Sequence, residues 1–335
     1  MTGGSGAAGP GGRESSSPGG GGPARDFRFA RQTLPYRVFA TWNIHYDCDY
    51  HCRYCHAPKP GKSGVRDAVY LKAEGWLRIW EGLYERYGTW EILVSGGEPF
   101  TYPGFMDLLV GLSRIHLMGV CTNLGWDVER FVSEVDPQRV RIETSFHPES
   151  AGLAEFAAKL KKLKAAGFEP TVNFVPWPPL LKMLGEIKAA MEDAGCQVTL
   201  QPFIGEWEGR RYPQGYTDDE KKSLGIFKDE CNEKTVEFKT TEKAAGTKGR
   251  PCRMGQNYVF IHPDGEASRC CRDHTFSLGN LAQGTFALLD EAVPCAADNC
   301  NCWRCMVTDR EDFWWRHWGR YHVTDLAMAA KGGKP

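Results

Sequence analysis

Between residues 38 and 203, short runs of apolar and β-branched residues alternate with longer stretches whose apolar residues recur every three or four positions. The first pattern is typical of buried strands and the second of amphipathic helices. It predicts strands over Val38–Ile44, Glu91–Ser95, Leu117–Thr122, Val140–Phe146, Thr171–Val175 and Val198–Pro202. It predicts helices over Lys72–Tyr87, Gly104–Ser113, Val128–Val135, Leu153–Ala166 and Leu180–Ala194.

Strands that alternate with helices form a parallel sheet with right-handed crossovers. Six such units are fewer than the eight of a closed barrel, so the sequence predicts an α/β fold with an open partial (β/α)6 barrel. Catalytic and ligand-binding side chains are then expected on the loops that follow the carboxyl ends of the strands.

The pattern changes after residue 204, where a polar stretch extends to about residue 249 and a cysteine-bearing segment follows. We expect a domain boundary near residue 245, with a barrel over 36–245 and a smaller domain over 246–326. In the smaller domain, Tyr258–His262 and Glu266–Arg269 flank Pro263-Asp264-Gly265, which predicts a β-hairpin. Residues 1–25 are rich in Gly, Ser and Pro and are predicted to be disordered, and 327–335 to be a tail.

The 335 residues carry a net charge of -1, which gives no electrostatic reason to expect nucleic acid or an anionic membrane as partner. No apolar run has the length of a membrane span, and no secretory signal is seen, so we expect a cytoplasmic protein. Thirteen cysteines are unusual in such a chain, and their clustering favours metal ligation over disulfides.

Three cysteines, Cys48, Cys52 and Cys55, lie in one loop after the first predicted strand. Spacings of three and two residues let a short loop hold three irons of a four-iron cluster and leave the fourth iron open. A structural zinc site is the alternative, although such sites usually close all four positions with two ligand pairs.

The spacing resembles the C-x3-C-x-aromatic-C signature of the radical S-adenosylmethionine (SAM) superfamily, with Tyr54 at the aromatic position. A second motif of that family, Gly96-Gly97-Glu98-Pro99, ends the second predicted strand. The resemblance implies that SAM chelates the open iron of a 4Fe–4S cluster. Reductive cleavage of SAM then gives a 5′-deoxyadenosyl radical that takes a hydrogen atom from the substrate. It also implies that the second motif meets the amino group of the bound methionine.

Further SAM contacts in this family come from the ends of later strands. By position, the resemblance points to Asn123, Ser145, Asn173 and Gln201, with Ser145 first. Each of these residues is equally well interpreted as a polar side chain that satisfies a strand end.

Cys252 and Cys270 enclose Gly265 in the pattern C-x12-G-x4-C, which resembles the start of the SPASM and twitch extensions of radical SAM enzymes. No cysteine follows Cys305, so the resemblance favours the twitch arrangement. It implies one auxiliary 4Fe–4S cluster held by Cys252, Cys270, Cys302 and Cys305, with Cys300 or Cys295 able to replace one of the last two. Two auxiliary clusters, or a zinc knuckle over 300–305, are the alternatives.

Cys271 is interpreted either as a buried side chain that only fills space in the core or as a thiol that returns a hydrogen atom to a substrate radical. Cys121, Cys196 and Cys231 are expected to be simple core or surface thiols. The segment 203–212 follows the last predicted strand and is expected to overhang the barrel mouth. The aromatic run 313–318 is expected to pack against the barrel or to form a stacking platform.

The leading hypothesis is therefore a radical SAM enzyme with an auxiliary cluster that oxidises or epimerises a small molecule. The resemblance also implies a reductant such as flavodoxin or ferredoxin. The stretch before Cys48 is shorter than the leader-binding domain of many peptide-modifying relatives, which favours a small substrate over a ribosomal peptide. Peptide maturation remains an alternative, as does a non-catalytic metal or electron-transfer protein, which would leave Gly96-Gly97-Glu98-Pro99 unexplained.

Overall fold

The computed structural model describes residues 34, 37–55, 57–63, 65–224, 244–271 and 273–300. Through this part of the chain runs one nine-stranded sheet in the order β13-β12-β11-β1-β2-β3-β4-β5-β6. Seven of its strands are parallel, and six of them follow one another in the barrel: β1 (Val38–His45), β2 (Trp90–Gly96), β3 (Leu117–Thr122), β4 (Val140–Phe146), β5 (Thr171–Phe174) and β6 (Val198–Leu200). Among the described strands, β6 pairs with β5 alone, so the predicted open partial barrel is confirmed.

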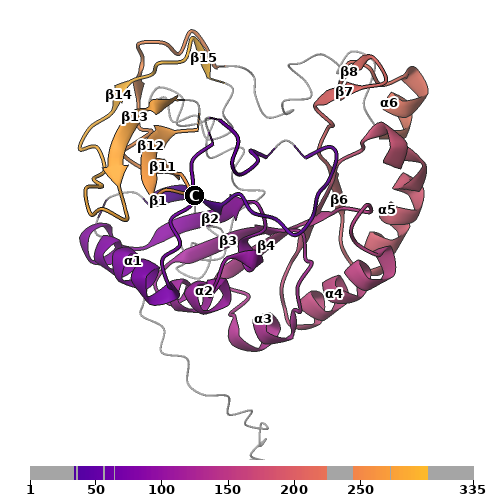
Figure 1. The fold of residues 1–335 in the computed structure, drawn as a ribbon, viewed down its shortest axis with the longest axis horizontal. Helices are drawn as coiled ribbons and strands as arrows, with labels where there is room; N and C mark the ends of the chain where they lie inside the picture. The colour runs from indigo at the N-terminus through magenta and orange to yellow at the C-terminus, as the bar shows by residue number, and fades with distance from the viewer. Residues whose placement is uncertain are drawn as a thin grey trace, which may run out of the picture.

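Helices cover the outer, convex side of this sheet (Figure 1). They are α1 (Ala73–Tyr87), α2 (Phe105–Ser113), α3 (Glu129–Glu134), α4 (Leu153–Ala165) and α5 (Leu184–Asp193). Two 3-10 turns, η1 (Pro99–Thr101) and η2 (Pro178–Met183), precede α2 and α5. The single helix predicted over Leu180–Ala194 is therefore divided, because Pro178 and Pro179 open a 3-10 turn before α5 begins.

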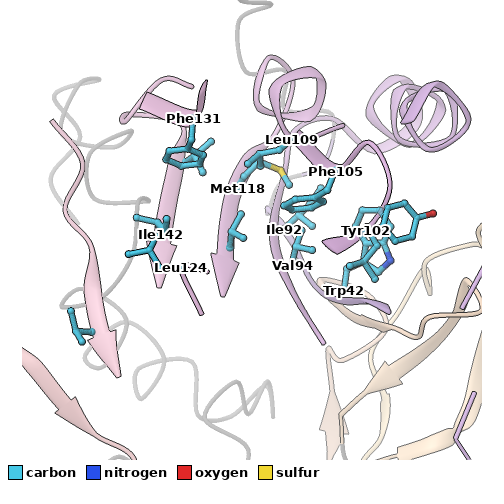
Figure 2. Close-up of a cluster of buried hydrophobic side chains, with 14 of the residues drawn as sticks. Trp42, Ile92, Val94, Tyr102, Phe105, Leu109, Met118, Leu124, Phe131 and Ile142 are labelled. Carbon is cyan, nitrogen blue, oxygen red and sulfur yellow. The ribbon is translucent and has the colours of Figure 1, made fainter. Parts of the chain in front are cut away.

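The convex face of the sheet is apolar at alternate positions along every strand. Trp42, Ile92, Val94, Met118 and Ile142 are each at most 1% exposed and pack beneath the helices (Figure 2). Side chains alternate between the two faces of a strand, so the residues between these positions face the other way, into the barrel. Truncation of one buried tryptophan or phenylalanine to alanine costs about 3–5 kcal/mol, so this layer stabilises the scaffold of the site.

The concave face, in contrast, is polar. Asn43 is aligned with Ser95, Cys121 with Glu143, and Ser145 with Asn173 on neighbouring strands. The parallel register places these half-buried side chains in rows across the inside of the barrel. Polar groups inside an otherwise apolar barrel indicate a surface for binding polar ligands.

The second cysteine segment continues the same sheet. Strand β11 (Tyr258–Ile261) pairs parallel with β1, β12 (Glu266–Cys270) returns antiparallel to β11, and β13 (Asp273–Asn280) follows β12. The predicted hairpin is confirmed, with Gly265 at φ 81° in its turn. Its pairing with β1 was not predicted from the sequence, because a parallel partner more than 200 residues away leaves no local signal.

Short elements complete the described chain. They are β7 (Gly205–Trp207), β8 (Arg210–Tyr212), α6 (Asp218–Leu224), β9 (Ala244–Ala245), β10 (Pro251–Cys252), β14 (Val293–Pro294) and β15 (Asn299–Cys300). Three antiparallel pairs join β7 with β8, β10 with β14, and β9 with β15.

In the described ranges, no helix is both long and apolar enough to cross a bilayer. The predicted disordered start, the tail and the aromatic run 313–318 lie outside the described residues, and the domain boundary near 245 stays a prediction.

His116 links the pH dependence of stability to this core. It is fully buried between α1 and β2, where its Nδ1 accepts from the Trp90 amide at 3.1 Å. Burial lowers the pKa of His116 to about 3, so the folded protein keeps it neutral. The unfolded chain takes up a proton near pH 6.5, so stability is present above that pH and is lost as the pH falls from there toward 3.

We therefore expect the free energy of unfolding of the wild type to fall relative to His116→Gln by about 1.4 kcal/mol per pH unit between pH 6 and pH 4. Urea denaturation followed by tryptophan fluorescence measures this difference. Parallel pH profiles for the two proteins would contradict the assignment.

Candidate functional site

The three cysteines of the first motif lie in the loop that leaves the carboxyl end of β1. Cys48 is half-buried, Cys52 is buried and Cys55 is exposed, and none of the described cysteines forms a disulfide. The backbone N–H of Cys55 donates to the carbonyl of Cys52 at 3.2 Å, which folds the loop into a tight turn. All three thiols therefore lie on the loop that follows β1, and their role as cluster ligands stays a prediction.

Side chains at the ends of β3 and β4 hold this loop in place. Asn123 Nδ2, just after β3, donates to Asp49 at 2.7 Å. After β4, the Glu149 carboxylate accepts from Arg53 Nε at 2.7 Å and from the Arg53 backbone N–H at 3.2 Å. The loop between the thiols is therefore fixed by two neighbouring strands as well as by the strand that it follows.

The aromatic residue of the motif, Tyr54, faces inward. It is 6% exposed, its hydroxyl lies 3.1 Å from His147 Nδ1, and its ring packs on Trp177. The Arg53 guanidinium lies 4.5 Å above the same Trp177 ring. Tyr54 thus anchors the loop to the ends of β4 and β5.

The two glycines of the second motif let β2 approach the start of the cysteine loop. A Cβ at Gly97 would lie 1.9 Å from the Asp47 carbonyl oxygen, and one at Gly96 would lie 2.1 Å from that of His45. Gly96 also has a φ of 125°, which side-chain-bearing residues rarely adopt. The N–H groups of Gly97 and Glu98 donate to His45 and Asp47 at 2.8 and 2.9 Å, which ties the two motifs together.

Glu98 is 2% exposed, and its carboxylate accepts hydrogen bonds from this chain. The donors are the Phe100 N–H at 3.1 Å, the Thr122 hydroxyl at 2.8 Å and the Asn123 N–H at 2.6 Å. Burial raises the pKa of Glu98 to about 7, against the lowering effect of these hydrogen bonds. In this structure Glu98 joins the ends of β2 and β3, a bracing role that the motif alone did not reveal.

Burial works against the thiolate form in this loop, whereas hydrogen-bond donors near Cys48 favour it. Burial raises the pKa of Cys52 to about 11, and the neighbouring Cys55 and Cys48 thiols add to the shift. The backbone N–H of Tyr50 donates to Cys48 Sγ at 3.4 Å, and Asn123 Nδ2 lies 3.9 Å from the same sulfur. Such donors stabilise a thiolate once a metal displaces its proton, so these residues fit a thiolate-held cluster. Within the described ranges, no three His, Cys, Asp or Glu side chains are arranged to hold a single metal ion.

The other predicted SAM contacts are divided between two places. Asn123 donates hydrogen bonds to Asp49 and Glu98 and accepts one from the Gly125 N–H, so its polar groups bind other parts of this chain. Gln201 Nε2 donates to Asn173 Oδ1 at 3.1 Å, and Ser145 is aligned with Asn173 on the adjacent strand. The last three side chains thus lie together on the concave face, at the carboxyl ends of β4, β5 and β6.

A polar group on the concave face was missed by sequence reasoning. The Cys121 thiol lies 3.6 Å from Glu143 Oε2, Glu143 pairs with Arg141, and the Ser95 hydroxyl hydrogen-bonds Cys121. Burial raises the pKa of Cys121 to about 11, so the thiol stays protonated. Alternation along β3 and β4 is the signal that could have placed Cys121 inside the barrel rather than among simple core thiols.

The second group of cysteines lines a cavity of about 120 Å³ beside β12 and β13. Among the residues that the structure describes, four thiols line it, from Cys252, Cys270, Cys295 and Cys300. Cys302 and Cys305, which the sequence favours as ligands, lie outside the described residues. Cys271 packs in the apolar group formed by Phe39, Met254 and Tyr258 rather than along the cavity wall.

The segment 203–212, predicted to overhang the mouth, forms the hairpin of β7 and β8. Trp207 contacts Trp177 with ring centroids 4.7 Å apart, beyond the end of β5. Figure 1 shows this hairpin and the β14–β15 region on opposite sides of the sheet's open end. The cysteine loop lies between them.

Comparison with known families gives two matches along the chain. The Radical SAM superfamily profile matches residues 42–176, and an iron–sulfur cluster-binding domain profile, SPASM, matches residues 252–306. The first match spans both motifs of the barrel, and the second spans the cysteines around the cavity. No curated protein matches the chain at significant similarity.

Comparison with solved structures gives matches at low sequence identity. A crystal structure of anSMEcpe with bound AdoMet has a TM-score of 0.51 at 13% identity, covering 74% of this chain and 76% of that chain. Streptococcus suis SuiB bound to S-adenosylmethionine gives 0.48 at 14% identity over 74% of this chain, and bound to precursor peptide SuiA it gives 0.49 at 14% over 76%. The chain spans 64% and 65% of the two SuiB chains.

Proposed function

Because the chain belongs to the radical SAM superfamily and carries an iron–sulfur cluster-binding SPASM domain, we propose that it oxidises a small, polar substrate by SAM-derived radical chemistry. The cluster that Cys48, Cys52 and Cys55 would hold supplies the electron that cleaves SAM to methionine and a 5′-deoxyadenosyl radical. One observation carries the proposal: a loop with three thiols is pinned to the ends of β1, β2, β3 and β4, above a polar concave face.

The residues around the loop have separate tasks in this proposal. Asn123 and the Tyr50 N–H donate toward Cys48 and favour its thiolate form. Gly96 and Gly97 keep the end of β2 against His45 and Asp47, where the cysteine loop begins. Tyr54 and Trp177 close the space beneath the loop and exclude water from it.

The concave face supports a substrate with several polar groups. Ser145, Asn173 and Gln201 offer hydroxyl and amide groups near the cysteine loop, where SAM would bind. Farther along the sheet, Glu143 and Arg141 present opposite charges on one strand, and the thiol of Cys121 lies beside them. Such a mixture of donors and acceptors fits a hydroxyl- or amine-bearing molecule better than an apolar one.

The four thiols around the second cavity favour oxidation over a redox-neutral outcome. The substrate radical becomes an oxidised product when it loses a further electron and a proton. A second iron–sulfur site in the same chain would accept that electron. The site borders β12 and β13, which belong to the same sheet as the barrel strands. Epimerisation, which would return a hydrogen atom to the substrate, needs no such electron acceptor.

Anaerobic reconstitution tests the proposal directly. We expect about eight irons per chain, four for each cluster, and formation of 5′-deoxyadenosine when dithionite and SAM are added. Zinc in place of iron, or no deoxyadenosine, would contradict the enzyme assignment. Deuterium transfer from labelled polyols and amino sugars into 5′-deoxyadenosine would support a small substrate, whereas transfer only from labelled peptides would favour peptide maturation.

A further inference from the structure

The polar inner side of the barrel continues onto the C-terminal hairpin. The Tyr258 hydroxyl on β11 donates to Thr41 Oγ1 on β1 at 3.0 Å, so both side chains lie on the concave face. Residues at every second position of a strand share a face, and the His262 N–H extends the ladder by donating to the Glu266 carbonyl at 2.8 Å. His262 therefore lies on the concave side too, beyond β1, whereas Ile261 is buried in the core on the other side.

Two histidines from different strands meet on this face, on the part of the sheet that lies beside β1 in Figure 1. The ring centroids of His262, at the end of β11, and His274, on β13, lie 5.0 Å apart. Both rings also pack edge-on against Phe260, at 4.9 and 5.2 Å. His262 Nε2 lies 2.8 Å from the Ser268 hydroxyl oxygen across the hairpin, and His262 is buried. A histidine fixed in the sheet therefore supports a second histidine that packs on it.

The second histidine, His274, is held in one tautomer. One of its ring N–H groups donates to the backbone carbonyl of Cys271. Because a neutral imidazole carries one proton, the lone pair then lies on the other ring nitrogen, which can accept a proton. Among the described residues His274 is exposed, so this nitrogen can meet a bound molecule and pass a proton on to solvent.

The charges around the pair favour neutral imidazoles. Burial lowers the pKa of His262 to about 4, and Arg66 and His274 lower it further against the effect of Asp264. Burial and Arg66 also lower the pKa of His274, against the effects of Asp273 and of the backbone hydrogen bond. Arg66 lies in the segment before α1 and forms an ion pair with Asp264 in the hairpin turn at 2.7 Å. Both imidazoles are therefore neutral at pH 7, the form that accepts a proton.

The other basic side chains described inside the barrel are occupied by partners from this chain. Glu143 forms an ion pair with Arg141, and Glu98 accepts hydrogen bonds from three donors. His147 is half-buried against the cysteine loop. Of these described groups, His274 combines a fixed tautomer with an exposed position.

Oxidation of an alcohol by the chemistry proposed above needs such a base. The 5′-deoxyadenosyl radical takes a hydrogen atom from the carbon that bears the hydroxyl and leaves a radical on that carbon. This radical becomes a carbonyl when its O–H bond breaks and the C=O double bond forms. One proton then passes to a base and one electron to an oxidised iron–sulfur cluster, so atoms and charge balance. Strand β13, which carries His274, also borders the cavity lined by the second group of cysteines.

We propose that His274 accepts the hydroxyl proton of the substrate as the carbon radical is oxidised to a carbonyl, and that His262 positions the His274 ring. The proposal rests on the function proposed above and narrows the substrate to an alcohol that becomes an aldehyde or ketone. His274 touches the reacting hydroxyl in this step and is the catalytic residue. His262 acts through His274 and is a positioning residue, held in turn by Ser268.

Product analysis tests the role of His274. The holoenzyme is incubated with SAM, limiting dithionite and C–H-deuterated polyols and amino sugars, and the carbonyl product is measured per 5′-deoxyadenosine formed. We expect His274→Gln to keep its iron and its deuterium transfer but to lower this ratio by a factor on the order of 100. The substrate radical should then accumulate and be visible by electron paramagnetic resonance.

Two further variants separate proton transfer from an effect on the fold. Added imidazole should restore the carbonyl product in His274→Ala, because a free base takes the place of the missing ring. Thr275→Ala is the matched control, since the neighbouring side chain on β13 points to the opposite face, and it should match the wild type.

The positioning role of His262 is measured from the pH profile of carbonyl formation. His262→Ala removes a ring that shields His274 from water, so the pKa of His274 should return toward its usual value of about 6.5. The acid limb, below which His274 is protonated and accepts no proton, should then move to higher pH. His262→Gln, which can still bond to the Ser268 hydroxyl, should keep most of the wild-type profile. An unchanged profile in His262→Ala would show that His262 only fills space.

Failure of the base is distinct from failure of the function on which it rests. A wild-type carbonyl yield in His274→Gln, or no rescue by imidazole in His274→Ala, would overturn the role of His274 while wild-type deuterium transfer still supports the radical enzyme. If the wild type transfers no deuterium from any of the polyols and amino sugars, the alcohol substrate is wrong, and both proposals are overturned.

Discussion

Replacing Cys48, Cys52 and Cys55 together with alanine should abolish 5′-deoxyadenosine formation and lower the iron content from about eight to about four per chain. In the proposed function the three thiols would be the protein ligands that the loop offers, and among the described residues the Tyr50 N–H and Asn123 Nδ2 lie beside Cys48 Sγ. The auxiliary cluster should survive, because its cavity is lined by other segments of the chain.

Cys196→Ala is the matched control for this variant. Its thiol is buried beside α5 and lies outside both cysteine groups, so iron and deoxyadenosine should stay at wild-type levels. Iron that remains near eight in the triple variant would contradict the assignment of the loop. Deoxyadenosine formed at the wild-type rate would contradict the site itself.

The barrel was predictable because local patterns specify it. The apolar alternation of β3 and β4, and the helical period of α4, gave ends that agree with the structure to within one residue. Motif spacing likewise placed Cys48 and Gly97 at adjacent strand ends, and the structure joins these ends through hydrogen bonds from Gly97 to His45 and from Glu98 to Asp47. These features depend on neighbours in sequence or on the fixed geometry of parallel strands.

Other parts of the site depend on contacts between distant residues. The sequence indicates that Glu98 is acidic, but only the fold shows that it accepts from Thr122 and Asn123. The same holds for Cys121, whose neighbour Glu143 comes from the next strand. No local pattern predicts such partners, because register between strands is set by packing of the whole sheet.

The continuous sheet has a consequence for how the two cysteine groups work together. The parallel pairing of β11 with β1 fixes the cavity's β12 wall relative to the strand that leads into the Cys48 loop. Hydrogen-bonded strands lie about 4.8 Å apart, so the spacing between the two thiol sites is set by backbone geometry and not by a flexible linker. A fixed separation would suit the electron transfer from substrate to the auxiliary cluster that we propose above.

Gly97→Ala should lower 5′-deoxyadenosine formation by a factor on the order of 100 or more while leaving the auxiliary cluster intact. The added Cβ would lie 1.9 Å from the Asp47 oxygen and 2.7 Å from the Tyr46 carbonyl carbon, which are backbone atoms. The strand end and the cysteine loop must therefore move apart, and the hydrogen bonds from Gly97 to His45 and from Glu98 to Asp47 are lost or stretched. A displacement of about 1 Å at a reacting centre is enough for a loss of this size.

Gly82→Ala provides the matched control, because it is the same chemical change in the interior of α1, where an added Cβ meets nothing within 4 Å. That variant should keep full activity and gain about 0.5–1 kcal/mol in the free energy of unfolding, since alanine favours the helix. Deoxyadenosine yield and iron content, measured side by side for the two variants, separate a local effect on the cysteine loop from a general effect on folding. Wild-type activity in Gly97→Ala would mean that the close contact of β2 with the loop is not needed for SAM cleavage. The positioning role assigned to the glycines would then be wrong.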